Sequence, residues 1–209
     1  MNSAIIVSAG SGNRFGDEIP KQFIKINGQE VLSYSVKTFL KHPEIHEIII
    51  VCHFEWIEHV KKNYPSCKIK KGGKSRQESC LNGVQAISKK TTNVLIHDAA
   101  RPFISKNIIS NCLTALKTHD SCAPIMPSTD SLVYLDKNKA SHIDRSKIFS
   151  IQTPQCFKKE TINQILHSNI TGTDEIGVLL KLSPESNITF IKGDIKNKKI
   201  TYPQDLNFF

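Results

Sequence analysis

A glycine-rich turn near the N-terminus, with two cations beside it, has the residue types that bind a phosphate. Gly10, Gly12 and Gly16 follow a short apolar run, and Arg14 and Lys21 lie close to them. Glycine has no Cβ and adopts positive φ easily, so backbone N–H groups in such a turn can surround an anion. Arginine and lysine add full positive charges. The segment predicts a phosphate site at the end of a first strand, although a plain strand-to-helix turn would use the same glycines.

The glycine spacing excludes two common nucleotide-binding motifs. A Walker loop requires a glycine, four residues and then Gly-Lys-Ser/Thr, and no glycine of this turn is followed by that pattern. The dinucleotide fingerprint places its third glycine three residues after the second, whereas Gly16 lies four residues after Gly12. The turn therefore belongs to another class of phosphate site, or serves only as a turn.

A second glycine-containing segment precedes a predicted helix. Gly73 is followed by Ser75, Arg76 and Ser79. Ser75 is suited to cap the helix, because its hydroxyl can accept a hydrogen bond from a backbone N–H of the first turn. The helix N-terminus would favour an anion or a polar base edge. A simple loop with an N-cap would need the same residues.

An acidic residue follows the apolar segment Val94–Ile96. Asp98 would emerge at the carboxyl end of a central strand, where a carboxylate can meet a metal ion bound to phosphates. The small Ala99 would let a ligand come close, and Arg101 offers a planar guanidinium to phosphate or a partner to Asp98. His97 points the opposite way in a strand, so we interpret it as structural.

Two further polar groups lie in the last third of the chain. Asp144-Arg145 precedes Gln152-Thr153-Pro154-Gln155, and Lys199 lies in the basic segment 196–201. Alone, the basic segment is typical of a solvated surface. No credible Ser-His-Asp or Cys-His set accompanies these groups, so the sequence does not indicate a covalent nucleophile.

The elements that must position these residues alternate between strands and helices. Apolar runs predict strands at Ile5–Ser8, Glu47–Cys52, Val94–His97, Ala123–Met126 and Ile188–Ile191. Helical spacing predicts helices near Val31–Lys41, Phe54–Asn63, Ser75–Ser88, Lys106–Thr118, Lys159–His167 and Thr173–Lys181. This order indicates β-α-β units and a three-layer α/β fold with a mainly parallel sheet, whose ligands bind at the carboxyl ends of the strands. The length of 209 residues suits a single domain, residues 1–209.

One segment interrupts the alternation and predicts a β-hairpin. Thr129–Asp136 alternates apolar and polar residues, positions 137–139 are typical of a turn, and Ala140–Asp144 returns. We assign residues 127–147 to this β-arm. A two-stranded hairpin is marginally stable in water, so we expect it to pack either against a second subunit or along the sheet edge of its own chain.

Composition narrows the classes of partner. The net charge is +9, but the lysines occur in small clusters and aromatic residues make up 7% of the chain. A nucleic-acid-binding face would combine a basic stripe with stacking aromatics, so we expect no nucleic-acid partner. Small polyanionic substrates could use the same positive field.

The cellular location of the protein can be inferred from targeting signals and from the spacing of its cysteines. The sequence has no secretory leader and no apolar stretch of membrane-spanning length, so we expect a cytoplasmic protein without membrane contact. Its six cysteines are scattered without a C-x-x-C pair, which predicts buried apolar residues and neither a zinc site nor disulfides.

Eight short motifs occur in order along the chain at compatible distances: Ser8-Ala-Gly-x-Gly-x-Arg14, Pro20-Lys-Gln-Phe23, Gly72-Gly-x-x-Arg76, His97-Asp-Ala-Ala-Arg-Pro102, Asp144-Arg145, Gln152-Thr-Pro-Gln155, Thr173-Asp-Glu175 and Asn197-x-Lys-Ile-Thr201. In these motifs the chain resembles the 2-C-methyl-D-erythritol 4-phosphate cytidylyltransferase family, whose close relatives are the ribitol-5-phosphate cytidylyltransferases. The resemblance spans essentially the whole chain. It implies a Rossmann-like nucleotidyltransferase domain with a protruding β-hairpin arm.

The resemblance also implies a role for each matching position. The nucleotide would be bound by Ser8, Ala9, Gly10, Gly12, Arg14, Lys21, Gly73, Arg76 and Ser79. The sugar phosphate would be bound by Asp98, Ala99, Arg101, Ser131, Arg145, Thr153, Thr173 and Lys199, with Arg101 supporting its loop. The catalytic residues would be Arg14, Lys21, Asp98 and Lys199, and Asp98 would lie beside the cofactor Mg²⁺. A homodimer would form through the β-arm, so that Ser131 and Arg145 serve the neighbour's active site.

The implied reaction transfers a cytidylyl group from CTP to 2-C-methyl-D-erythritol 4-phosphate and releases pyrophosphate, a step of non-mevalonate isoprenoid precursor synthesis. The attacking phosphate is already largely anionic at neutral pH, since its second pKa is about 6, so no histidine base is required. The reaction requires positioning and charge neutralisation of two polyanions.

Two alternatives remain at the level of sequence. Ser8, Lys74, Ser131 and Phe149 depart from the residues common in the family, which leaves ribitol 5-phosphate or a related polyol phosphate as another acceptor. The alternative of another class is a non-catalytic nucleotide-binding module, suggested by the end of the chain at Phe209 without the family's usual final helix.

Overall fold

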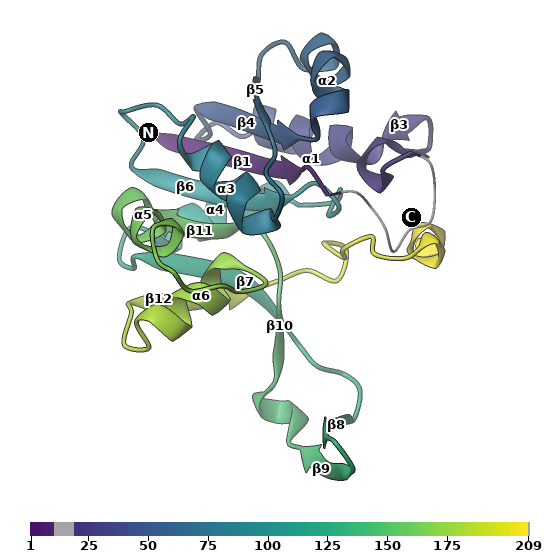
Figure 1. Ribbon diagram of the computed structural model, residues 1–209, viewed down its shortest axis with the longest axis vertical. Coiled ribbons are helices and arrows are strands. Elements are labelled where there is room, and N and C mark those ends of the chain that lie inside the picture. Colours follow the sequence, from purple (N-terminus) through teal and green to yellow (C-terminus); the bar gives the residue numbers. More distant parts are fainter. Residues whose placement is uncertain (11–18, 209) are drawn as a thin grey trace.

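The computed structural model describes residues 1–10 and 19–208, and an eight-stranded sheet forms its centre (Figure 1). The strands are β1 (Asn2–Ser8), β4 (Glu47–Cys52), β5 (Lys68–Lys71), β6 (Asn93–Asp98), β7 (Ser121–Pro127), β10 (Phe149–Ile151), β11 (Gln155–Lys158) and β12 (Ile188–Lys192). Their order is β10-β7-β11-β6-β1-β4-β5, and β12 also pairs with β7. All five predicted strands are therefore present.

The sheet is mixed but mostly parallel, which confirms the predicted fold class. β1 pairs in parallel with β4 and β6, and β4–β5 and β7–β12 are also parallel. β10 and β11 run antiparallel to their neighbours. The sequence did not reveal β5, β10 or β11, because they are short and β5 is mostly lysine. Lysine at a sheet edge keeps other strands from pairing there, so the composition of β5 fits its edge position.

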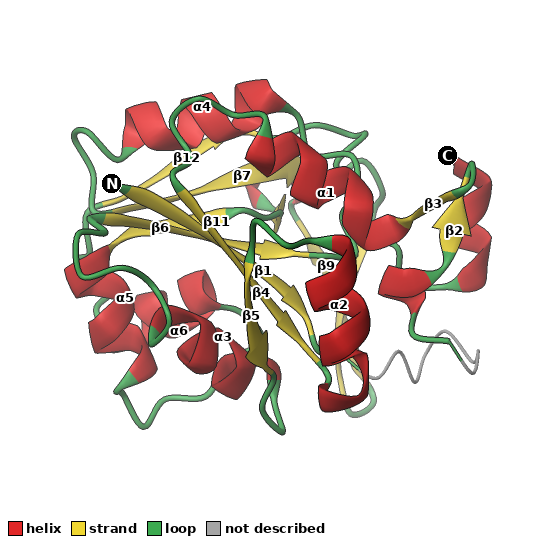
Figure 2. Cartoon of the chain, turned by 90° about the horizontal axis from the view of Figure 1, so that it is seen from above, coloured by secondary structure: helices red, strands yellow, loops and turns green. Residues whose placement is uncertain are grey.

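Helices cover both faces of the sheet and give the three layers seen in Figure 2. They are α1 (Val31–Leu40), α2 (Ile57–Asn63), α3 (Arg76–Val84), α4 (Lys106–Ala115), α5 (Lys159–Leu166) and α6 (Glu175–Leu182). α1, α2 and α4 lie on one face, and α3, α5 and α6 lie on the other. All six predicted helices form, most of them with shorter C-terminal ends. No helix in the described part of the chain is long and apolar enough to cross a membrane.

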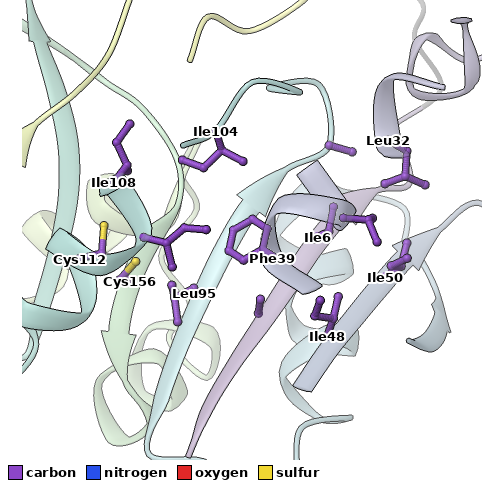
Figure 3. Packing of buried hydrophobic residues seen from close by; sticks show 14 of the residues in the cluster. Ile6, Leu32, Phe39, Ile48, Ile50, Leu95, Ile104, Ile108, Cys112 and Cys156 are labelled. Atoms are coloured by element: carbon purple, nitrogen blue, oxygen red, sulfur yellow. The ribbon is translucent and has the colours of Figure 1, made fainter. Parts of the chain in front are cut away.

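Alternation along the central strands builds the core on both faces. Ile6 and Ile50 pack towards α1 with Phe39, as Figure 3 shows, whereas Ile5 and Ile49 pack on the opposite face. Successive strand side chains point to opposite faces, so a strand that is apolar at every position is suited to a sheet covered on both sides. This arrangement fixes the carboxyl ends of β1, β4 and β6 at one edge of the domain.

The predicted hairpin is present and extends away from the body (Figure 1). β8 (Leu132–Asp136) and β9 (Lys139–Ile143) form a separate two-stranded sheet, and Lys137 takes positive φ in the turn between them. The alternative that the hairpin lies along the sheet edge of its own chain is therefore wrong. Its apolar side chains remain exposed, with Leu135 at 70% and Tyr134 at 58%.

Candidate active site

A cavity of about 540 Å³ lies at the carboxyl ends of β1 and β6. Ten of the residues proposed from the sequence line it: Ser8, Ala9, Gly10, Lys21, Gly73, Arg76, Ser79, Asp98, Ala99 and Lys199. Gly12 and Arg14 lie outside the described residues. The strands that end at this edge come from distant parts of the sequence, so the parallel sheet assembles the cavity.

The start of the glycine-rich turn is fixed by a glutamine that is not among the predicted site residues. The Nε2 amide of Gln22 donates to the carbonyl oxygens of Ser8 at 2.6 Å and Gly10 at 3.1 Å. The hydroxyl of Ser8 donates to the carbonyl oxygen of Val51 on β4. Gln22 is buried in the short helical turn Lys21–Phe23, so the same turn presents Lys21 and supports the loop opposite it.

The second glycine-containing loop approaches the first very closely. A Cβ on Gly72 would lie 2.2 Å from the Cβ of Ala9, so only glycine permits this distance. The Ser79 hydroxyl accepts from the backbone N–H of Gly73 and donates to the carbonyl oxygen of Ser75. Ser75 caps α3 by accepting from the N–H of Glu78, which confirms the predicted N-cap. The two loops thus form one wall of the cavity.

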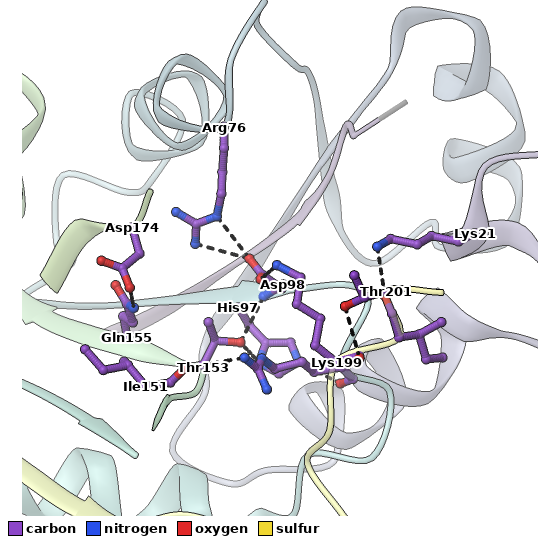
Figure 4. A network of polar contacts seen from close by, with 12 residues as sticks. Lys21, Arg76, His97, Asp98, Ile151, Thr153, Gln155, Asp174, Lys199 and Thr201 are labelled. Carbon is purple, nitrogen blue, oxygen red and sulfur yellow. Dashed lines mark hydrogen bonds and ion pairs between the residues drawn. The ribbon is translucent and has the colours of Figure 1, made fainter. Parts of the chain in front are cut away.

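Asp98 is the centre of the polar network shown in Figure 4. Its Oδ1 accepts from Nε of Arg76 at 3.1 Å, and its Oδ2 accepts from Nζ of Lys199 at 2.6 Å. Burial disfavours the carboxylate, but the positive charges of Arg76 and Lys199 outweigh burial and hold the pKa of Asp98 well below its usual range. Asp98 is therefore an anion between two cations, and its carboxylate forms ion pairs with these and not with the guanidinium of Arg101.

Arg76 has a second anionic partner. Its Nη1 donates to both carboxylate oxygens of Glu175, at 2.7 and 2.8 Å. Burial opposes the charge of the guanidinium, but Asp98 and Glu175 outweigh burial and raise the pKa of Arg76 above its usual range. The guanidinium lies at the wall of the cavity with its hydrogen bonds directed to these carboxylates. In this structure Arg76 therefore holds the carboxylate of Asp98 in place, whereas the resemblance had implied contact with the nucleotide.

His97 and Thr153 hold the backbone beneath the cavity. The N–H of Asp98 donates to Thr153 Oγ1 at 3.1 Å, which lies 3.1 Å from His97 Nδ1. Nε2 of His97 lies 2.9 Å from the carbonyl oxygen of Arg101. A carbonyl can only accept, so Nε2 carries the proton and Nδ1 accepts from Thr153. Burial lowers the pKa of His97 to about 4, so the ring is neutral and structural, as the sequence indicated.

Thr153 and Arg101 were both expected at the sugar phosphate, with Arg101 also supporting its loop, and here the side chains of both bond to the protein. Thr153 is 4% exposed, and its hydroxyl is engaged beneath Asp98. Arg101 donates from Nη1 to the carbonyl oxygen of Asn197 at 2.9 Å, and Asn197 Nδ2 donates to the carbonyl oxygen of Thr153. Burial lowers the pKa of Arg101. Arg101 thus supports the loop after β6 and joins it to the segment that carries Lys199.

Two lysines meet at this C-terminal segment from different parts of the chain. Nζ of Lys21 donates to the carbonyl oxygen of Ile200 at 2.8 Å, and the neighbouring Lys199 donates to Asp98. The N–H of Ile200 in turn donates to the carbonyl oxygen of Ala100. The basic segment that seemed a solvated surface by composition therefore forms part of the cavity.

Besides Arg101 and Thr153, three more proposed substrate-binding residues are not among those that line the cavity. Ser131 and Arg145 belong to the β-arm region and are exposed, and Arg145 donates to the carbonyl oxygen of Thr129 at 2.6 Å. Thr173 is exposed just before α6. The structure of one chain brings none of the three to Asp98.

Among the described residues, two places have the chemistry to bind a metal ion. Asp98 offers carboxylate oxygens inside the cavity. The thiols of Cys112, Cys122 and Cys156 lie within 4.8 Å of one another, but they are buried in the hydrophobic core. Two of them donate to backbone carbonyls, Cys122 to Cys112 and Cys156 to Pro154. All six cysteines are free in the structure.

Glu175 and Gln22 are two residues near the cavity whose roles were not predicted from the sequence. Both lie inside motifs quoted for the family resemblance, Thr173-Asp-Glu175 and Pro20-Lys-Gln-Phe23. Both are nearly fully buried, with 2% and 3% of their surfaces exposed. Their place in the motifs could be seen in the sequence, but their burial and their partners could be seen only in the structure.

Comparisons with known proteins agree along the whole chain. A model of the family described as 2-C-methyl-D-erythritol 4-phosphate cytidylyltransferase matches residues 2–208. The protein of that name from Lachnospira eligens is 35% identical, over 99% of this chain and 96% of the relative. A bifunctional ribulose 5-phosphate reductase/CDP-ribitol pyrophosphorylase from Haemophilus influenzae is 33% identical, over 98% of this chain and 46% of the relative. The solved structure of 4-diphosphocytidyl-2C-methyl-D-erythritol synthase from Anaerococcus prevotii superposes with a TM-score of 0.89 at 27% identity, covering 99% of this chain and 93% of that one.

Proposed function

The chain belongs to the 2-C-methyl-D-erythritol 4-phosphate cytidylyltransferase family, and from that membership we propose that it transfers the cytidylyl group of CTP to 2-C-methyl-D-erythritol 4-phosphate. The observation that carries the proposal is the convergence of Lys21, Lys199 and Asp98 at one cavity. Two lysines and a carboxylate in one cavity have the charges needed to hold two phosphate groups and a metal ion. The family membership identifies which phosphates these are.

The proposed reaction is an in-line displacement at the α-phosphorus of CTP. An oxygen of the acceptor phosphate forms the new P–O bond, the bond to the bridging oxygen of the β-phosphate breaks, and pyrophosphate leaves with that electron pair. The acceptor oxygen is anionic near neutral pH, so no side chain has to remove a proton. Catalysis then consists of positioning and of neutralising the charge that develops on the transferred group.

The cavity residues divide these tasks. Lys21 would bind the triphosphate together with Arg14, and Lys199 would bind the acceptor phosphate beside Asp98. The two loops that carry Ala9 and Gly73 would hold the cytosine and ribose. These loops meet closely, and backbone groups that cannot move distinguish a base by its hydrogen-bonding edge better than flexible side chains do.

The carboxylate of Asp98 fits a hard divalent cation such as Mg²⁺ that is also bound by substrate phosphates. Magnesium prefers oxygen ligands, and in many proteins it is held by one or two carboxylates together with substrate phosphates. Asp98 supplies such a carboxylate, anionic and within the cavity. We propose that Asp98 would hold the ion, which would neutralise part of the triphosphate charge.

The exposed arm supports a homodimer as the working form. β8 and β9 are paired with each other and extend from the body with apolar side chains exposed. Exposed apolar groups of this kind mark association surfaces. In the proposed dimer the arm carries Ser131 and Arg145 towards the acceptor site of the partner, which explains their distance from Asp98 within one chain.

Pyrophosphate release in the presence of CTP and Mg²⁺ tests the proposal. We expect release with 2-C-methyl-D-erythritol 4-phosphate and none without an acceptor. Ribitol 5-phosphate is the second candidate, because the Haemophilus influenzae relative is named a CDP-ribitol pyrophosphorylase. Faster release with ribitol 5-phosphate would change the acceptor, whereas a folded protein inactive with both acceptors would contradict the proposed transferase.

A further inference from the structure

Glu175 is a buried carboxylate that does not line the cavity, yet it contacts the cation that holds Asp98. Its side chain is 3% exposed. The residues on either side of it are bound to the sheet, since Gln155 donates to the Asp174 carboxylate and accepts from the N–H of Ile176. Glu175 therefore has a fixed backbone at the start of α6, and its carboxylate accepts hydrogen bonds from Arg76. Figure 4 shows Arg76 and the preceding residue, Asp174.

Arg76 contacts its two acidic partners unequally. Nη1 lies 2.7 and 2.8 Å from the oxygens of Glu175, whereas Nε and Nη2 each lie 3.1 Å from Oδ1 of Asp98. Nη2 makes no hydrogen bond of good geometry. The closer and better aligned partner of the guanidinium is thus Glu175.

The four charged groups form a line with alternating sign: Glu175, Arg76, Asp98 and Lys199. Their formal charges sum to zero. Arg76 is thus shared between Glu175 and Asp98, and Asp98 is shared between Arg76 and Lys199, the more exposed of its two cations. Removing the charge of Glu175 would leave Asp98 between two cations with a net charge of plus one. A divalent cation would then meet a repulsive site.

We propose that Glu175 is a positioning residue that sets the affinity of the active site for its divalent cation, by engaging Arg76 and leaving Asp98 anionic towards the cavity. This inference rests on the proposed function, in which Asp98 holds the ion and CTP is the ligand. Groups that orient and polarise a metal ligand commonly change metal affinity by about 10- to 100-fold when they are altered.

The measurement is the dissociation constant of CTP without acceptor, determined by calorimetry once with Mn²⁺ and once with a chelator. Mn²⁺ replaces Mg²⁺ as a probe with similar oxygen ligands. The dissociation constant with the chelator divided by that with Mn²⁺ reports how strongly the metal and the nucleotide favour each other's binding. In Glu175→Gln we expect this ratio to fall about tenfold, or to one, through weaker binding with Mn²⁺. Binding with the chelator should be unchanged or tighter, because the site has gained positive charge.

The matched control is Glu47→Gln. Glu47 is also a buried carboxylate paired with a cation, Lys68, with 7% of its side chain exposed. It lies at the amino end of β4, at the opposite edge of the sheet from the cavity. Its neutralisation should lower the melting temperature without changing the ratio. A role of Glu175 in stability alone predicts the same behaviour for both variants.

Two more variants keep the inference testable if Glu175→Gln is poorly folded. Glu175→Asp retains the negative charge, so its ratio of CTP dissociation constants should stay close to the wild-type value. Arg76→Gln combined with Glu175→Gln removes the uncompensated cation and should restore the ratio towards the wild-type value. A wild-type ratio in Glu175→Gln, or no recovery in the double variant, overturns the inference. Wild-type protein that binds no CTP, or binds it equally with and without Mn²⁺, contradicts the proposed nucleotide or metal role instead.

Discussion

At the scale of single residues, most charged groups at the cavity have protein partners that fix their positions before any ligand binds. Asp98 is bound by Arg76 and Lys199, and Lys21 by the carbonyl oxygen of Ile200. Such preorganisation is effective in phosphoryl transfer, because charges that are already in place need not reorganise as the transition state forms. The cost is that each substrate phosphate must replace a protein partner.

Lys21→Ala tests the importance of a single cation. We expect turnover to fall about 100-fold, because one charge directed at the transferring phosphate is lost. The melting temperature should change much less than turnover, because a loss of catalytic charge does not unfold the chain. Pyrophosphate release and thermal melting measure the two effects. Lys61→Ala, which removes an exposed lysine paired with Glu58, is the control, and equal losses in both variants would contradict a specific role for Lys21.

His97 predicts a pH dependence of stability. Burial lowers its pKa from 6.5 to about 4, so between these values the unfolded chain binds a proton that the folded chain does not. Stability is therefore complete above pH 6.5 and decreases as the pH falls towards 4, by up to about 3 kcal/mol. Urea unfolding from pH 7 to pH 4 measures the slope. In His97→Gln the slope over this range should be smaller, and an unchanged slope would assign it to other groups.

At the scale of elements, two loops after different strands must fit together to form the nucleotide wall. Gly72 follows β5 and Ala9 follows β1, and they approach so closely that a side chain on Gly72 has no space. The sheet fixes the positions of both strand ends, so the fit depends on the absence of one Cβ. The sequence showed the glycine, but only the fold showed which residue it meets.

Gly72→Ala should therefore separate the loops and weaken CTP binding. We expect a dissociation constant about 10- to 100-fold higher, because small displacements of positioning groups have effects of this size. Calorimetry with CTP measures the change. Ala9→Gly removes the Cβ on the other side, so the combination Gly72→Ala with Ala9→Gly should recover most of the affinity. Failure of this rescue would show that the contact does not determine the fit.

At the scale of the whole molecule, the arm separates the chain into a body that holds the cavity and a hairpin that reaches outwards. The hairpin adds no strand to the central sheet. Its exposed leucine and tyrosine would be costly in a lone chain, since exposed apolar area favours association. The body and the arm can therefore be tested separately.

Replacing residues 130–143 by a short glycine-serine turn should leave the body folded and give a monomer. We expect turnover to fall, because the proposed dimer supplies Ser131 and Arg145 across the interface. Sedimentation gives the mass, and pyrophosphate release gives the activity. Arg145→Ala in the full chain should raise the KM for the acceptor while the dimer persists. A shortened chain that still sediments as a dimer would place the interface elsewhere.

The sequence by itself determined the fold class and most of the elements. Apolar runs such as Glu47–Cys52 reproduce the strand bounds, because a strand buried on both faces needs continuous apolar residues. It also indicated the chemistry at positions such as Asp98 and Lys21, since loops at strand ends carry the motifs. Short or polar strands such as β5 had no such signal, because their pairing depends on a neighbour that is distant in sequence.

Only the tertiary structure decided which charges meet. Arg76, assigned to the nucleotide by its motif, is bound between Asp98 and Glu175, and Arg101, expected to support its loop, joins that loop to the segment of Lys199. The partner of a charged side chain is set by distances between segments many residues apart, and no local pattern contains these distances. The residue types therefore predicted a phosphate site, and the fold determined how its cations are shared between substrate and protein.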